Sequence, residues 1–218
     1  MGEAMRKVHV HPLPLRIWHW VNALTVVLLI ITGIQLRVPG LPSLPPDSTA
    51  LLVHKCAGWV MVVSWFFWFL YSLASENLVH HYVIRKGDLK KALGQARFYL
   101  ISMFRGEENP HRPSPDQRFN PLQKIAYGAV MGLFTPVMLF TGILFGDTVV
   151  FRHHILLLQA VKVLDAIHVI GAYVFALYLI IHVYMATLGR RPYSHIKAMI
   201  VGYEEESEEQ GAEVDIHV

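Results

Sequence analysis

Residues 166–188 of the chain read AIHVIGAYVFALYLIIHVYMATL. This run contains no Asp, Glu, Lys or Arg, and a helix of about 20 apolar residues spans a bilayer core of about 30 Å. It holds two histidines, His168 and His182. At about 1.5 Å and about 100° per residue, they lie roughly 21 Å apart along the helix and only about 40° apart around it. The stretch therefore predicts one transmembrane helix that carries two histidine side chains on one face, at two depths in the membrane.

The overall composition agrees with a membrane protein. Hydrophobic residues make up 54% of the 218 residues, and charged residues only 16%, against about 25% in an ordinary soluble protein. Mean hydropathy is +0.39. The single cysteine, Cys56, excludes an internal disulfide, and the apolar content excludes a disordered chain. No feature points to nucleic acid as a partner.

Three further segments are long and apolar enough to cross a membrane, at about residues 15–36, 51–74 and 125–145. Together with residues 166–188, they predict an all-α fold. We expect a transmembrane four-helix bundle that occupies residues 1–200.

Two regions outside the spans carry separate predictions. The loop 76–124 contains an amphipathic stretch at about residues 88–104, which fits either a helix on the membrane surface or a helix packed on a partner subunit. Residues 201–218 include the acidic run EEESEE. Because such runs are usually solvated, we expect a disordered tail there.

The distribution of Lys and Arg predicts the orientation. Residues 1–16, 76–124 and 189–218 hold fifteen of the nineteen Lys and Arg residues. Cytoplasmic segments carry this excess in membrane proteins. Both termini and the loop 76–124 are therefore expected in the cytoplasm, with the chain crossing the membrane four times.

Ionisable groups are costly inside a membrane, so the four histidines within the spans are expected to have a function there. His19 lies near the cytoplasmic end of the first span, and His54 near the outer end of the second. By depth, His19 can pair only with His182, and His54 only with His168.

Two stacked bis-histidine sites in a four-helix bundle predict two haem b groups, with these four histidines as the iron ligands. Glycines 33, 58, 142 and 171 would leave room for a flat group. The haem is not covalently attached, because the chain has no C-x-x-C-H motif. The alternative is a transition-metal transporter, which would normally add carboxylates within the spans.

Several motifs resemble a known family. Residues 14–23 (PLRIWHWVNA), followed by Thr32-Gly33, are similar to the di-haem cytochrome b subunits of membrane-bound nickel–iron hydrogenases, of formate dehydrogenase (its gamma subunit) and of thiosulfate-reductase-type complexes. Residues 119–124 (FNPLQK) resemble the loop before the third helix in the formate dehydrogenase branch. The spacing of His168 and His182 matches the fourth helix there. The resemblance extends from about residue 8 to 196.

The resemblance implies the function. Such subunits pass electrons across the membrane between a partner on the outer (periplasmic) face, an iron–sulfur or multi-haem subunit, and a quinone, either menaquinone or ubiquinone, near the cytoplasmic side. We therefore expect an electron-transfer subunit of a quinone-linked oxidoreductase complex in the respiratory chain. The resemblance also implies a multi-pass protein of the cytoplasmic (inner) membrane of a bacterium or archaeon. A haem-bearing membrane anchor without its own quinone turnover is the alternative within this family.

The resemblance also adds candidate cofactor-binding residues. It implies that Asn120 lies at the quinone site, beside the inner haem. On chemical grounds, Gln123 and Lys124 are candidate donors to a quinone carbonyl, although Lys124 equally fits a lysine at the membrane edge. Arg16 fits either a partner for an inner haem propionate or a marker of the cytoplasmic edge.

Overall fold

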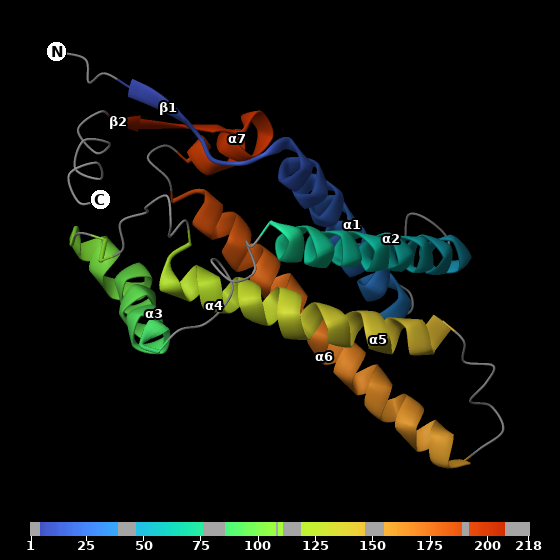
Figure 1. Cartoon of the computed structure of the whole chain (residues 1–218). Helices are drawn as coiled ribbons and strands as arrows, with labels where there is room; N and C mark the ends of the chain where they lie inside the picture. Colours follow the sequence, from blue (N-terminus) through green and yellow to red (C-terminus); the bar gives the residue numbers. More distant parts are fainter. Residues whose placement is uncertain are drawn as a thin grey trace. The chain divides into compact units, whose positions relative to one another are not determined.

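The computed structural model describes residues 5–38, 47–75, 86–107, 109–110, 119–146, 155–188 and 192–207. The helical elements are α1 (Leu13–Arg37), α2 (Asp47–Ala74), α3 (Asp88–Arg97), η2 (Phe98–Ser102), η3 (Met103–Arg105), α4 (Pro121–Ala129), η4 (Val130–Phe134), α5 (Thr135–Gly146), α6 (Ile155–Ala186) and α7 (Ser194–Val201) (Figure 1). The strands are β1 (Met5–His9) and β2 (Tyr203–Ser207). The chain forms two compact units, Met1–Ser64 with Thr141–Val218 and Trp65–Phe140, which we call the first and second unit.

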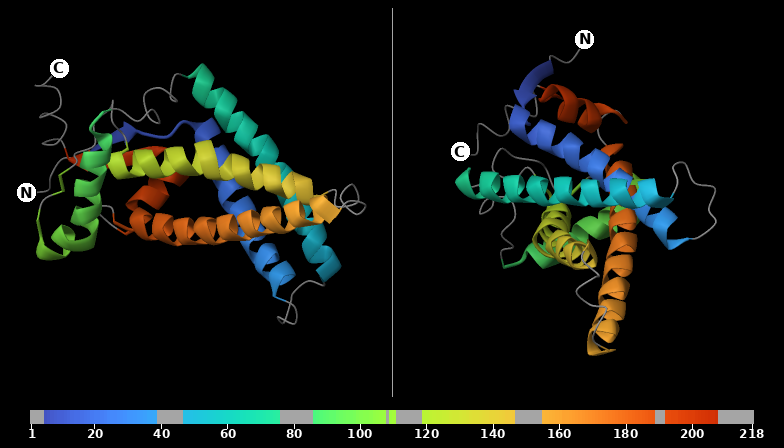
Figure 2. Two further views of the ribbon diagram at one scale, coloured as in Figure 1. Left: turned by 90° about the horizontal axis from the view of Figure 1, so that it is seen from below. Right: turned by 90° about the vertical axis from the view of Figure 1, so that its right-hand side faces the viewer.

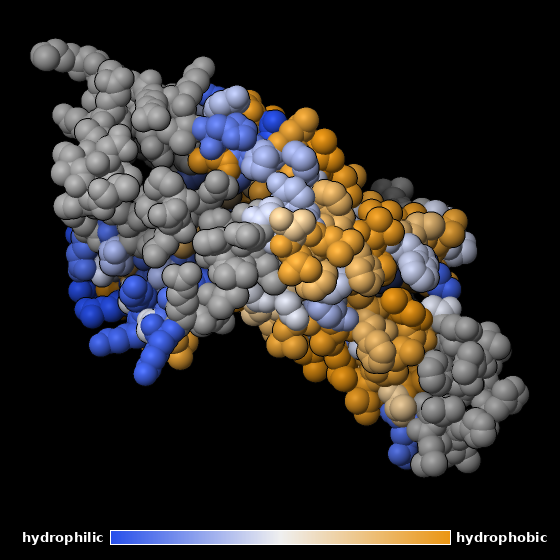
Figure 3. All heavy atoms as spheres, viewed as in Figure 1, coloured by the Kyte–Doolittle hydropathy of each residue, from blue (hydrophilic) through white to orange (hydrophobic). Residues whose placement is uncertain are grey.

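Four helices are long and apolar enough to cross a membrane. They cover Leu13–Arg37, Ser48–Ala74, Pro121–Gly146 and Gln159–Ala186. Large hydrophobic side chains are exposed along all four, and hydrophobic residues cover much of the visible surface of these helices (Figure 3). The prediction of an all-α fold with four transmembrane helices is therefore confirmed.

In the first unit, polar contacts join α1 to α2 near His19. The Trp18 indole N–H donates to the backbone carbonyl of Ser64 at 2.9 Å, and the Asn22 amide donates to the Ser64 hydroxyl at 2.6 Å. Satisfied polar groups of this kind hold helices together where no water is available. α1 also contacts α6, which runs without a break over 32 residues (Figure 2).

A short β-ribbon joins the two ends of the chain. β1 and β2 pair antiparallel, from Met5 opposite Ser207 to His9 opposite Tyr203. The tail was expected to be disordered from residue 201, and this is wrong for Tyr203–Ser207. The register places this acidic stretch opposite the basic residues of β1, a pairing between the chain ends that the composition of the tail alone does not reveal.

Gly202 makes the connection from α7 to β2. Its φ of +91° lies in the left-handed region that favours glycine. A Cβ at this position would lie 3.0 Å from the carbonyl oxygen of His11 and 3.2 Å from Cζ of Arg16. The ribbon thus places β1, which precedes the first span, beside β2, which follows the fourth span. The cytoplasmic location of these segments stays a prediction.

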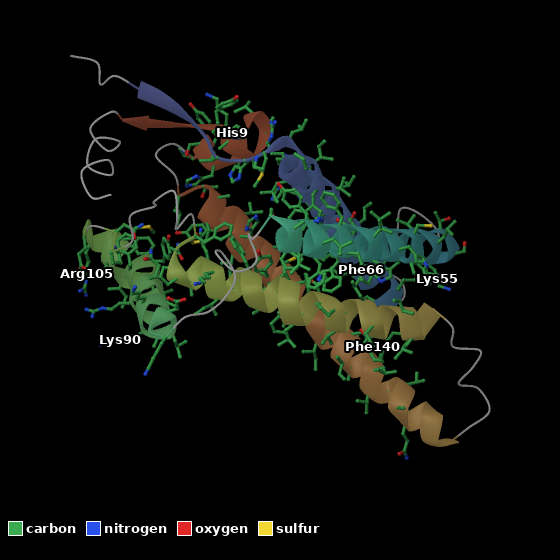
Figure 4. All side chains as sticks on the ribbon, viewed as in Figure 1. His9, Lys55, Phe66, Lys90, Arg105 and Phe140 are labelled. Atoms are coloured by element: carbon green, nitrogen blue, oxygen red, sulfur yellow. The ribbon has the colours of Figure 1, made fainter. Side chains whose placement is uncertain are left out.

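In the second unit, α3 packs on α4, and a partly buried ion pair joins them. Lys124 Nζ lies 2.9 Å from the Asp88 carboxylate. Leu89, Leu93, Leu100 and Phe104 are exposed on α3, η2 and η3, along with cationic residues such as Lys90 and Arg105, which extend outward in Figure 4. The segment expected as an amphipathic helix at 88–104 is thus helical from Asp88 to Arg105. Its position on the membrane surface stays a prediction.

The third span contains one turn of π-helix, η4, which ends two residues before Pro136. In this turn the N–H of Thr135 bonds to the carbonyl of Val130. The Met131 carbonyl would next accept from residue 136, but proline has no N–H. The Trp65 indole N–H donates to that carbonyl at 2.8 Å instead. Trp65 therefore satisfies a backbone acceptor that Pro136 leaves open inside the membrane.

We predict that Trp65→Phe lowers the free energy of unfolding by about 1–3 kcal/mol, because it leaves the Met131 carbonyl without its donor. The measurement is the thermal unfolding midpoint of the purified protein in detergent. Trp59→Phe is the matched control, because Trp59 is exposed on the same helix. Equal effects of the two substitutions would contradict the assigned role of Trp65.

Candidate functional site

The first unit brings four histidines of its membrane helices together in two pairs. The pair predicted to lie toward the outer face, called the outer pair, consists of His54 from α2 and His168 from α6, with ring centroids 6.4 Å apart. The inner pair consists of His19 from α1 and His182 from α6, with ring centroids 6.1 Å apart. All four side chains are partly buried. These are the pairs that depth in the membrane predicts, and α6 contributes one histidine to each.

The outer pair is held by two threonines. The Thr32 hydroxyl donates to the Leu28 carbonyl at 2.6 Å, so its oxygen is left to accept from His54 Nδ1–H at 2.8 Å. Thr141 Oγ1 lies 2.8 Å from His168 Nδ1. A histidine whose Nδ1–H is donated in this way keeps a lone pair on Nε2, which is the nitrogen that can bind a metal.

Two glycines pack against the same imidazole rings. A Cβ at Gly33 would lie 3.4 Å from Cε1 of His54, and a Cβ at Gly142 would lie 3.4 Å from Cε1 of His168. A Cβ at Gly58, one turn after His54, would meet no heavy atom of the described residues within 4 Å. The outer pair therefore has close glycine neighbours on α1 and α5.

The inner pair has different surroundings. The ring of Tyr178 stacks on His182 with centroids 5.7 Å apart and an interplanar angle of 19°. His19 Nδ1 is buried and has no hydrogen-bond partner among the residues that the structure describes. The neighbouring Trp20 contacts the His19 ring edge-to-face at 5.2 Å. Aromatic contacts thus flank both rings of the inner pair.

The spacing of both pairs fits one metal between two imidazoles. Imidazole nitrogens bind metals at about 2.0–2.1 Å, so the centres of two rings on opposite sides of one ion lie about 6 Å apart. Both measured separations are close to this value. Among the described residues, no group of three or more His, Cys, Asp or Glu side chains comes together. The donor set is therefore two neutral nitrogens per site, which suits a haem iron better than a transported ion.

The predicted quinone-site residues belong to the second unit, where they begin the third span. Asn120 is the N-cap of α4: its side-chain oxygen accepts from the Gln123 N–H at 2.8 Å, and the Gln123 side chain accepts from the Asn120 N–H at 3.1 Å. The Asn120 amide also donates to the Tyr99 hydroxyl at 3.1 Å. These contacts form a capping box, which stabilises the helix start whatever else the residues do.

The other candidate, Arg16, lies in the first unit beside α7. Its guanidinium donates to the carbonyl of Ile200 and packs against Gly202. Its Nε is buried and has no hydrogen-bond partner among the residues described. Arg16 thus contacts Ile200 and Gly202, and it has one buried donor that no described residue accepts.

The sequence does not predict the contacts of Thr32, Thr141 and Tyr178 with the histidines. A signal for the threonines exists, because both are followed by glycine and isoleucine near the ends of the first and third spans. Their contact with histidines on the next helix depends on packing, however, and Tyr178 carries no comparable sequence signal.

Comparison with known proteins identifies the family. A family described as prokaryotic cytochrome b561 matches residues 10–202. The chain belongs to this family. It is a membrane haem-b electron-transfer subunit and a multi-pass protein of the bacterial membrane.

Individual relatives cover most of the chain. A protein of Escherichia coli K12 named "Putative cytochrome YdhU" is 31% identical over 90% of this chain and 74% of its own length. A protein of Cupriavidus necator named "Probable Ni/Fe-hydrogenase B-type cytochrome subunit" is 24% identical over 93% of this chain and 88% of its own. A protein of Rhodobacter capsulatus with the same description is 27% identical over 84% and 76%.

The capping box generates a stability prediction. Asn120→Ala should lower the free energy of unfolding by about 1 kcal/mol, because the first turn of α4 loses its side-chain acceptor. Asn120→Asp retains the acceptor and should leave stability nearly unchanged. Thermal unfolding of both purified variants in detergent tests this. An Asp variant as unstable as the Ala variant would show that the cap is not the important contact.

Proposed function

We propose that the protein is a di-haem cytochrome b, in which His54 and His168 hold the outer haem and His19 and His182 hold the inner haem. The observation that carries this proposal is the pair of ring separations, 6.4 and 6.1 Å, each suited to one six-coordinate iron. Bound haem supplies a one-electron couple between ferric and ferrous iron. The chain supplies four neutral imidazoles and an apolar surrounding that excludes water.

The shared helix α6 gives the two sites a fixed separation. It is continuous from Ile155 to Ala186, so His168 and His182 lie about 21 Å apart along its axis. This distance covers roughly two thirds of a bilayer core of about 30 Å. The protein thereby has one redox site near each side of the membrane, as transfer of electrons across it requires. At the inner site, the buried Nε of Arg16 is a candidate donor to a haem propionate.

The proposed electron partners lie on opposite sides of the membrane. Two relatives are named as B-type cytochrome subunits of a Ni/Fe-hydrogenase, which supports a catalytic redox subunit as the partner. We place an iron–sulfur or multi-haem subunit on the outer face, next to the outer pair. On the cytoplasmic side, the proposed second substrate is a quinone, menaquinone or ubiquinone, near the start of the third span.

Asn120 and Gln123 are the proposed donors to a quinone carbonyl. The Asn120 amide has two N–H groups, and one of them is donated to Tyr99. The side-chain oxygen of Gln123 makes the capping contact. Its Nε2 has no hydrogen bond to any residue that the structure describes. Lys124 is bound to Asp88 at 2.9 Å and is left out of the proposed site.

One observation favours a second candidate, a haem-bearing anchor without quinone turnover. The capping box gives both Asn120 and Gln123 a structural reason to be present. Their donors must therefore be tested separately from their capping role.

Haem content tests the proposed iron ligands. The purified protein should show two b-type haems per chain in its reduced-minus-oxidised spectrum. His54→Ala and His168→Ala should each remove the same haem, and His19→Ala and His182→Ala should each remove the other. His9→Ala is the control, because His9 lies in β1, outside the spans. Loss of a single common haem in the His168 and His182 variants would contradict the assigned pairs.

A substitution at Gln123 distinguishes a protein that turns over quinone from one that serves as a haem-bearing membrane anchor. Gln123→Glu retains the oxygen that caps α4 but removes the Nε2 donor. Losing one hydrogen bond of about 1.4 kcal/mol should raise the KM for a quinol analogue about tenfold, with the unfolding temperature unchanged. Reduction of the haems by dithionite is the control measurement and should proceed as in the native protein. Unchanged quinol kinetics in this variant and in Asn120→Asp would favour the anchor.

A further inference from the structure

Each histidine of the outer pair contacts a threonine and the glycine that follows it on another helix. On α1, Thr32 bonds to His54 of the next helix, while Gly33 leaves room for its ring. On α5, Thr141 bonds to His168 of α6, and Gly142 leaves room in the same way. The two hydroxyl-to-nitrogen distances are both 2.8 Å, and the two glycine distances are both 3.4 Å. The repeated Thr-Gly-Ile sequence thus corresponds to a repeated contact in space.

A helix threonine commonly needs no such partner, as Thr25 shows. The hydroxyls of Thr25 and Thr32 both donate to the carbonyl four residues earlier, at 2.7 and 2.6 Å. The two side chains are buried to nearly the same extent, at 5% and 4% exposure. Only Thr32 also accepts from a histidine. The hydrogen bond of Thr32 to the Leu28 carbonyl therefore does not explain why Thr32 also contacts His54.

We propose that Thr32 and Thr141 are positioning residues that hold the outer histidines as Nδ1–H tautomers, in a fixed ring orientation, and thereby set the reduction potential of the outer site. This inference rests on the proposed di-haem function. A hydroxyl that accepts from Nδ1–H makes the opposite ring nitrogen more basic. A more basic ligand favours ferric over ferrous iron, so the two threonines should lower the potential of the outer haem. No such hydroxyl bonds to His19 Nδ1 among the described residues.

The test uses the full-length protein, purified with its haem, and valine and serine variants at both positions. Thr32→Val and Thr141→Val keep the shape of the side chain and remove the hydroxyl, whereas Thr32→Ser and Thr141→Ser keep the hydroxyl. Thr25→Val is the matched control for a buried hydroxyl on α1. The readouts are the midpoint potentials of the two haems in a spectroelectrochemical titration and the g values of the ferric haems in electron paramagnetic resonance.

Both valine variants should raise the midpoint potential of the same haem, shift its g values, and leave the other haem unchanged. The serine variants and Thr25→Val should match the native protein. The proposal is overturned if neither valine variant shifts a potential, if the two act on different haems, or if Thr25→Val produces the same shift.

A valine variant that loses haem remains informative, because replacing such a partner weakens metal binding about 10–100-fold. Retention of the outer haem in the serine variant, alongside its loss in the valine variant, supports the proposal. Equal loss in both overturns it. Native protein that lacks two haem transitions would instead contradict the proposed function itself.

Discussion

The single unbroken helix α6 sets the geometry on which the rest of the site depends. It carries His168 and His182 on nearly the same face, fourteen residues apart, and so determines the depths at which partners must appear. α2 supplies His54 at one depth, and α1 supplies His19 at the other. A break in α6 between its two histidines would rotate one site away from its partner. The regularity of this helix is therefore as important to the proposed function as the histidines themselves.

The cost of unpaired polar groups in lipid explains most of the other polar contacts. Trp65 donates to the carbonyl that Pro136 leaves open, and Thr32 and Thr141 bond to the outer histidines. At the membrane edge, Asn120 caps α4 through its side chain. Each of these residues has a structural reason to be polar where it is. A functional role at any of them has to be shown by a measurement that stability alone would not change.

Spans and histidine pairs could be predicted from sequence because both follow from properties of single helices. Apolar length identifies a span, and the rise of 1.5 Å per residue converts sequence position into depth. The contact of Thr32 with His54 joins residues on different helices, and the ribbon joins the two ends of the chain. Composition classified the tail as solvated, although five of its residues find a strand partner. What the sequence analysis missed consists mainly of contacts between distant segments.

The two histidine pairs differ in the contacts that surround their rings. Hydroxyls support both outer histidines, whereas His182 is stacked on Tyr178 and His19 Nδ1 lies buried without a described partner. Under the proposed di-haem function, the basicity argument predicts that the two threonines stabilise ferric iron at the outer pair. The reduction potential of that site is therefore the property that distinguishes positioning by Thr32 and Thr141 from a role in stability alone.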